Sequence, residues 1–153
     1  NAVNPLGQVP ALIDDAGVAW SDSPLICARL DALAPTPRFI PEGEARWSVL
    51  RREVIADGAM EQGVKIRLEL LRPDGERSSA WIVRWRAGIL RSLDAAEAQA
   101  DSAFDLAAVA TVCALTWLDL RFPDLDWRTA RPKLAALQTA LEARASFSDT
   151  APS

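Results

Sequence analysis

Residues 4–33 read NPLGQVPALIDDAGVAWSDSPLICARLDAL and carry the signals that decide the fold. Pro10 opens a short apolar run, residues 11–13, and a proline that enters a strand stands at its first position or on an edge. Residues 14–17 have the composition of a turn, and residues 18–20 form a returning apolar run. The pattern predicts a two-stranded hairpin whose first strand is buried.

A helix is predicted directly after this hairpin. Ser and Asp are favoured at a helix cap and proline in the first helical turn, and Asp22, Ser23 and Pro24 stand there in that order. An apolar helical face follows, made of Leu25, Ile26, Leu30 and Leu33. An extended backbone before Pro10, close to a helix N-terminus, offers hydrogen bonds and a positive dipole end to a small peptide-like anion.

The overall composition excludes several classes of function. The 153 residues fit one ordinary domain or one and a half small ones, and half of them are hydrophobic, which is enough for a sizeable core. The net charge of −4 argues against a nucleic-acid partner. The chain has no histidine, which excludes histidine-based triads and histidine metal ligands, and we predict no metal site. No apolar run approaches the ~20 residues that span a bilayer, so no membrane partner is expected.

The two cysteines, Cys27 and Cys113, stand far apart in two predicted apolar helices. We interpret them as buried thiols in a reducing compartment, which points to the cytoplasm. A disulfide or a reactive thiol is the alternative. The chain begins with Asn1 and enters a strand almost at once, and a hairpin with one helix cannot close a core alone. We therefore expect an N-terminal segment to precede this sequence.

Three prolines between residues 34 and 43 predict a stiff linker, which separates residues 1–33 from a helical part, residues 44–153. A first long helix is predicted from Glu44 to Leu71. Its expected apolar stripes are Trp47, Leu50 and Val54, followed by Met60, Val64, Leu68 and Leu71. Gly58 and Gly63 lie between the stripes and suggest a bend or a close approach to a neighbouring backbone.

The remaining segments predict three further helical features. Ser78 or Ser79 caps a helix with the stripe Ile82, Trp85, Ile89 and Leu93, which ends in a surface loop over residues 94–101. Ser102 and Asp105 form a capping box at the head of a buried helix that extends to about Leu120. The last amphipathic helix carries Leu134, Leu137 and Leu141, and residues 147–153 are expected to be a polar tail.

Four separated motifs now occur in a characteristic order. They are residues 4–10 (NPLGQVP), residues 22–27 (DSPLIC), Ser102-x-x-Asp105, and Trp117-Leu118 through Phe122-Pro123 to Trp127. Across a proline-rich linker, this set closely resembles the bacterial-type cytosolic glutathione S-transferases. The resemblance implies an α/β plus all-α fold: a partial thioredoxin-like domain, lacking its first strand, helix and second strand, followed by an all-helical domain. It also implies a homodimer.

The resemblance assigns roles to four residues of the hairpin corner. Val9 would pair its backbone with the cysteinyl part of glutathione, and Pro10 would be the cis-proline of the family. Asp22 would meet the ammonium of the γ-glutamyl group. Ser23 would hold the carboxylate of that group through its hydroxyl and backbone N–H. The plain alternatives are an edge-strand proline at Val9-Pro10 and a simple helix cap at Asp22-Ser23.

The implied reaction is the attack of glutathione thiolate on a hydrophobic electrophile, with glutathione as a substrate. The residue that activates the thiol lies in the expected missing segment, so no catalytic residue can be named in this chain. An acceptor pocket between the domains is expected near Trp47, Leu50 and Arg51, while Ser102 and Asp105 would be structural. The alternatives are a non-catalytic relative used for protein interaction or regulation and a generic helical binding module.

Overall fold

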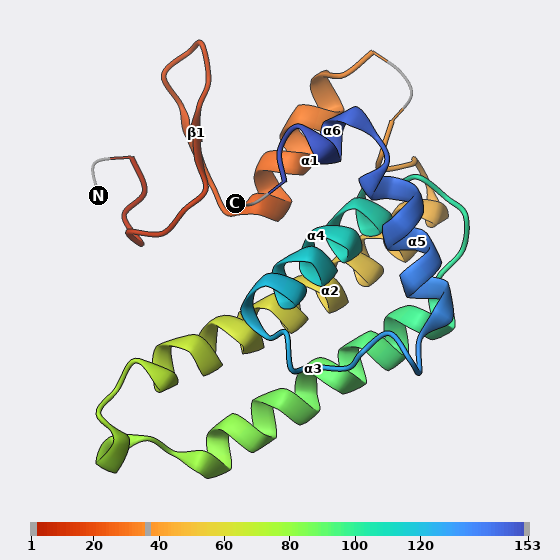
Figure 1. Ribbon diagram of the computed structural model, residues 1–153. Helices are drawn as coiled ribbons and strands as arrows, with labels where there is room; N and C mark the ends of the chain where they lie inside the picture. The colour runs from red at the N-terminus through yellow and green to blue at the C-terminus, as the bar shows by residue number, and fades with distance from the viewer. Residues whose placement is uncertain (1–2, 36–37, 152–153) are drawn as a thin grey trace.

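The computed structural model describes residues 3–35 and 38–151, so residues 36–37 of the expected linker lie outside the description. The elements, in chain order, are β1 (Ala11–Ile13), β2 (Ala19–Ser21), α1 (Ser23–Leu33), α2 (Glu44–Leu70), a 3₁₀ turn η1 (Asp74–Glu76), α3 (Ser79–Gln99), α4 (Leu106–Arg121), α5 (Pro132–Glu142) and α6 (Ala145–Ser148). Figure 1 shows β1, β2 and α1 at one end of the helical part. Among the described residues, no helix is long and apolar enough to cross a membrane.

The predicted hairpin is confirmed. β1 and β2 pair in an antiparallel register that sets Ala11 opposite Ser21 and Ile13 opposite Ala19. The turn between them is held by the carboxylate of Asp14, which accepts hydrogen bonds from the backbone N–H groups of Ala16 and Val18. The prediction of a buried first strand is wrong, because Ile13 is 56% exposed. Within the described residues the sheet has only these two strands, so little protein covers their faces.

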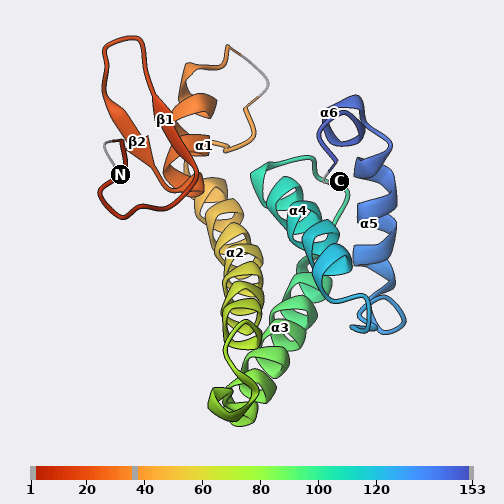
Figure 2. The ribbon, with the colours of Figure 1, turned by 60° about the vertical axis from the view of Figure 1, so that its left-hand side comes forward.

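The helical part is built on α2, which forms a long antiparallel pair with α3, and α4 packs against the same side of α2 (Figure 2). α5 packs against α4. The main core combines side chains from all four helices and the connection after α4. Its buried members are Ile66, Ile89, Leu93, Leu115, Leu118, Phe122, Trp127 and Leu134. The predicted buried character of α4 and the predicted stripe of α3 are both confirmed.

Most of the predicted apolar stripe of α2 is not buried, although Leu50 packs against the cluster of Ile40 and Val49. Trp47, Val54, Val64, Leu68 and Leu71 are all exposed. The side of α2 that faces the bundle instead carries mostly smaller residues, which are Val49, Glu53, Ala56, Ala59, Gly63 and Ile66. This face of α2 packs against two helices, α3 and α4, and helices approach closely only where the side chains between them are small. The large apolar side chains of α2 therefore point away from the bundle.

Gly63 lies where α2 meets the end of α4. A Cβ atom at this position would overlap the indole ring of Trp117 and lie 3.2 Å from the ring of Phe122. Gly58, only five residues earlier, faces open space. The predicted close approach is therefore present at Gly63, although the neighbour is an aromatic side chain and not a backbone.

Two segment boundaries differ from the sequence-based prediction. α3 continues to Gln99, through most of the stretch that the sequence predicts to be a surface loop. The expected polar tail, residues 147–153, begins inside α6, and the ring of Phe147 packs against a buried cluster made of Ala108, Val112 and Leu141. One aromatic side chain, Phe147, therefore packs this otherwise polar segment against the bundle.

We expect Gly63→Ala to lower the free energy of unfolding by about 1–3 kcal/mol, since the new methyl group forces Trp117 to move. The matched control is Gly58→Ala, which should raise it by up to about 1 kcal/mol through helix propensity alone. Urea unfolding followed by tryptophan fluorescence measures both changes. Equal effects of the two substitutions would contradict the close contact at Gly63.

Candidate functional site

The hairpin register brings the two predicted binding segments together. Ala11 pairs with Ser21, so the chain leaves the ladder through Val9-Pro10 on one strand and enters α1 through Asp22-Ser23 on the other. The Val9-Pro10 peptide bond is cis, in agreement with the expectation for Pro10. All four residues therefore lie at the same end of β1 and β2.

Val9 is the most open of these four residues. It is 93% exposed, and within the described part of the chain neither its N–H nor its C=O has a backbone partner. The loop before it is anchored by Asn4, whose side-chain amide donates to the carbonyl of Gln8 at 2.7 Å and accepts from the N–H of Leu6 at 2.9 Å. This anchor was not predicted, although an Asn that opens a loop is a known signal for such a turn.

Asp22 caps α1 in an uncommon backbone conformation. Its φ is 72° and its ψ is 135°, and its carboxylate accepts a hydrogen bond from the N–H of Ser23 at 2.9 Å. Positive φ is uncommon for a residue other than glycine and tends to occur at ligand sites. A cap explains the hydrogen bond but not the backbone conformation, since most caps have extended φ and ψ.

Two further carboxylates, both on α2, were not predicted and lie near enough to Asp22 to feel its charge. Glu53 is buried and Asp57 half-buried, and the spacing of four residues places both on one side of the helix. Burial raises the pKa of Glu53, and the negative charges of Asp57 and Asp22 raise it further. Burial also raises the pKa of Asp57, again with the help of Asp22. The sequence offers no signal that separates these two acids from the solvated acids of an ordinary helix face.

The three residues predicted for an acceptor pocket lie within one turn of α2 but have different surroundings. Trp47 is 62% exposed, whereas Leu50 packs against the cluster of Ile40 and Val49. Arg51 donates a hydrogen bond to the side-chain carbonyl of Gln99 at 3.2 Å. None of the three lines either of the two cavities described below.

The larger cavity, of about 520 Å³, lies between α1, α4 and the C-terminal residues. Its lining is mostly apolar and includes both cysteines. Burial raises the pKa of the Cys27 thiol, with help from Glu53 and Asp57, and protein around the Cys113 thiol raises its pKa too. Both thiols are therefore protonated and weakly nucleophilic at neutral pH. Neither cysteine forms a disulfide. Cys113 lines the cavity but is exposed, so the prediction that it is buried is wrong.

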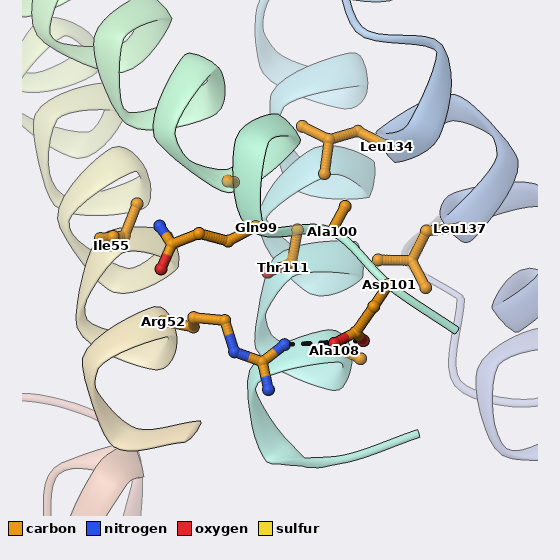
Figure 3. A pocket seen from close by; sticks show the side chains of 10 residues that line it. Arg52, Ile55, Gln99, Ala100, Asp101, Ala108, Thr111, Leu134 and Leu137 are labelled. Carbon is orange, nitrogen blue, oxygen red and sulfur yellow. Dashed lines mark ion pairs between the residues drawn. The ribbon is translucent and has the colours of Figure 1, made fainter. Parts of the chain in front are cut away.

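The smaller cavity, of about 20 Å³, lies among α2, α3, α4 and α5 (Figure 3). Arg52 pairs there with Asp101 across the opening, at 3.9 Å. A space of this size holds about one water molecule, so this cavity is structural.

The predicted capping box is replaced by a simpler cap. α4 begins at Leu106, and Asp105 is itself the N-cap, accepting from the N–H of Ala108 at 2.9 Å. The expected arrangement, in which Ser102 caps and Asp105 reaches back, is wrong. The other oxygen of Asp105 accepts from the guanidinium of Arg52, which holds the carboxylate at the helix start.

A short chain of hydrogen bonds connects the hairpin unit to the helical part. The carboxylate of Asp31 in α1 accepts from the N–H of Phe39 at 2.6 Å. The carbonyl of Phe39 accepts in turn from the N–H of Leu106 at 3.0 Å. The linker therefore joins the last turns of α1 to the first residue of α4, next to the cap.

Among the described residues, no group of three potential metal ligands is close enough to hold a metal ion.

Comparison with known proteins gives consistent matches over both parts of the chain. Residues 1–38 match the family model described as glutathione S-transferase, N-terminal domain, and residues 79–137 match the corresponding C-terminal domain. The uncharacterized GST-like protein YibF of Escherichia coli (strain K12) is 33% identical over 156 residues, which cover 97% of this chain and 77% of that protein.

Solved structures agree with these matches. A glutathione transferase family member from Pseudomonas fluorescens Pf-5, crystallised with bound glutathione, is 40% identical with a TM-score of 0.95, over 100% of this chain and 78% of that chain. A glutathione S-transferase from Methylobacillus flagellatus with GSH bound is 36% identical, also with a TM-score of 0.95, over 99% of this chain and 79% of that chain.

The cap predicts a measurable difference between two neighbouring residues. Asp105→Ala removes the cap of α4 and leaves Arg52 without its closest partner, so we expect a loss of about 1–3 kcal/mol in the free energy of unfolding. Ser102→Ala should change it by less than about 0.5 kcal/mol. Chemical denaturation of the two variants is the measurement. If Ser102→Ala lost more stability than Asp105→Ala, Ser102 would be the N-cap, as the capping box predicts.

Proposed function

We infer, from the fact that this chain belongs to the glutathione S-transferase family, that it binds glutathione and directs its thiolate at a hydrophobic electrophile. The observation that carries this proposal is the hairpin register, which brings the exposed backbone of Val9 beside the start of α1. Family membership also removes the generic helical binding module from the alternatives.

The proposed binding mode uses backbone groups first. An extended peptide can add to the free N–H and C=O of Val9 as a further strand would, and glutathione presents such a backbone at its cysteinyl residue. Pro10 donates no N–H, so pairing there depends on Val9. Ser23 offers its hydroxyl and the positive end of α1 to the γ-glutamyl carboxylate, and Asp22 offers a negative charge to the ammonium.

Several finer assignments belong to the same proposal. We assign residues 1–33 to a glutathione-binding domain, 34–43 to a linker and 44–153 to a helical domain, with the electrophile meeting the start of α2 near Trp47, Leu50 and Arg51. Exposed apolar side chains along α2 and α3 support a homodimer. They are Val54, Val64, Leu68, Leu71, Trp81 and Val83. Two free cysteines support a cytoplasmic location.

A non-catalytic role is the second candidate function. Catalysis requires a group that lowers the pKa of the glutathione thiol, and a nearby hydroxyl or thiol donor does so by stabilising the thiolate. Cys27 and Cys113 line the apolar cavity, and neither precedes Val9. These two thiols do not match the position of an activating residue. Binding for protein interaction or regulation is the alternative to turnover.

Glutathione binding is tested by isothermal titration calorimetry. We expect saturable binding to the wild-type chain and about tenfold weaker binding to Ser23→Ala, which loses one charge-assisted hydrogen bond. Ser48→Ala, at an exposed position of α2, serves as the control and should bind like wild type. A wild-type chain that takes up no glutathione would refute the proposal.

The ultraviolet absorbance of the bound thiolate distinguishes the two candidate functions. A pKa of bound glutathione below that of free glutathione supports the transferase, whereas an unchanged pKa supports the non-catalytic alternative.

A further inference from the structure

The loop before Val9 is closed by three hydrogen bonds that all involve Asn4. The backbone carbonyl of Asn4 accepts from the N–H of Gly7 at 2.9 Å, in a turn with asparagine first, proline second and glycine fourth, which is a favoured composition for a β-turn. The side-chain Oδ1 of Asn4 accepts from the N–H of Leu6 at 2.9 Å, and its Nδ2 donates to the carbonyl of Gln8 at 2.7 Å. Asn4 is only 6% exposed, so its side chain is fixed within the loop.

The bond to Gln8 requires an amide side chain. A turn of this kind needs only a side-chain acceptor at its first position, and aspartate or serine supplies one as asparagine does. Neither replaces the donor, because an aspartate carboxylate only accepts hydrogen bonds and a serine hydroxyl lies one bond closer to the backbone. Asn4 therefore does more than close the turn, since its Nδ2 also holds the peptide bond that leads into Val9.

This contact fixes the direction of the Val9 N–H group. The carbonyl of Gln8 and the N–H of Val9 belong to one peptide bond, which is trans. A trans peptide is planar and its C=O and N–H point in opposite directions, so a carbonyl held by Asn4 turns the Val9 N–H away from Asn4. Among the described residues this N–H has no acceptor, and Val9 is 93% exposed. The donor is thus oriented before a ligand arrives, which lowers the entropic cost of pairing with it.

We propose that Asn4 is a positioning residue for the ligand, because it orients the Gln8-Val9 peptide bond so that the Val9 N–H meets a backbone carbonyl of the ligand. The proposal rests on the proposed function, in which Val9 pairs with the cysteinyl part of glutathione. It adds that the affinity for glutathione depends on a buried side chain that acts through its neighbour. A ligand without a backbone carbonyl gains nothing from this donor, so the site favours peptide-like ligands.

The test uses two substitutions that keep the turn and remove the donor. Asn4→Asp and Asn4→Ser each retain an acceptor for the N–H of Leu6, but neither donates to the carbonyl of Gln8. In isothermal titration calorimetry we expect both variants to bind glutathione about tenfold more weakly than wild type. Asn4→Ser is neutral, so it separates the loss of the donor from the negative charge that Asn4→Asp brings near the glutathione anion.

The amide proton of Val9 gives a readout that general loosening of the chain does not imitate. In proton–nitrogen NMR spectra we expect saturating glutathione to move this proton downfield in wild type, because the N–H gains an acceptor, and by about half as much or less in both variants. The matched control is Asp14→Ala, which removes the hydrogen bonds from Ala16 and Val18 at the opposite end of the hairpin. It should keep the Val9 shift and bind glutathione within about twofold of wild type.

The outcomes separate the two proposals. If Asn4→Ser, or Asn4→Asp where Asn4→Ser fails to fold, binds glutathione as tightly as wild type, the role of Asn4 is overturned and glutathione binding stands. The role of Asn4 is also overturned if Asp14→Ala weakens binding by the same factor, or if glutathione binds to wild type without moving the Val9 amide proton. A wild-type chain that takes up no glutathione would overturn both proposals.

Discussion

The structure depends on how closely α2 approaches its neighbours. α3 and α4 both pack on the side of α2 that carries Ala56, Ala59 and Gly63, and larger side chains there would separate the three helices. Gly63 leaves no room for a Cβ atom beside the ring of Trp117, so this contact with α4 requires glycine. Because the same face of α2 continues into Glu53, the packing that builds the core also brings the acidic residues to the corner at α1.

A line of polar contacts connects the corner to the core. Asp31, the backbone of Phe39 and the first residue of α4 form one line of hydrogen bonds, and Arg52 adds a charged contact from α2 to the cap at Asp105. This arrangement ties the start of α4 both to the linker and to α2. An apolar cluster of Ile40, Val49 and Leu106 supports the same junction, and Cys27 and Ala28 of α1 pack against it.

The elements that could be predicted from the sequence are those with local signals. The hairpin, the start of α1 and the cap at Ser78 follow from prolines, glycines and hydroxyl side chains whose effects reach only a few residues. The buried face of α2 could not be predicted, because apolar residues recur on both sides of this helix and only its neighbours decide which side is covered. Glu53 and Asp57 were not predicted because acidic residues on a helix are normally solvated. The cap of α4 moved to Asp105 because a distant arginine, Arg52, stabilises it there.

The pair of α2 and α3 extends well beyond the other helices, as Figure 2 shows, and closes at η1. Near that end the two helices are supported mainly by each other, whereas further along α2 packs against α4 and α3 packs against α5. Local stability therefore falls along the length of the pair, and amide hydrogens should exchange fastest around residues 72–77. The same gradient makes this turn the natural place to insert a tag or a reporter domain without disturbing the core.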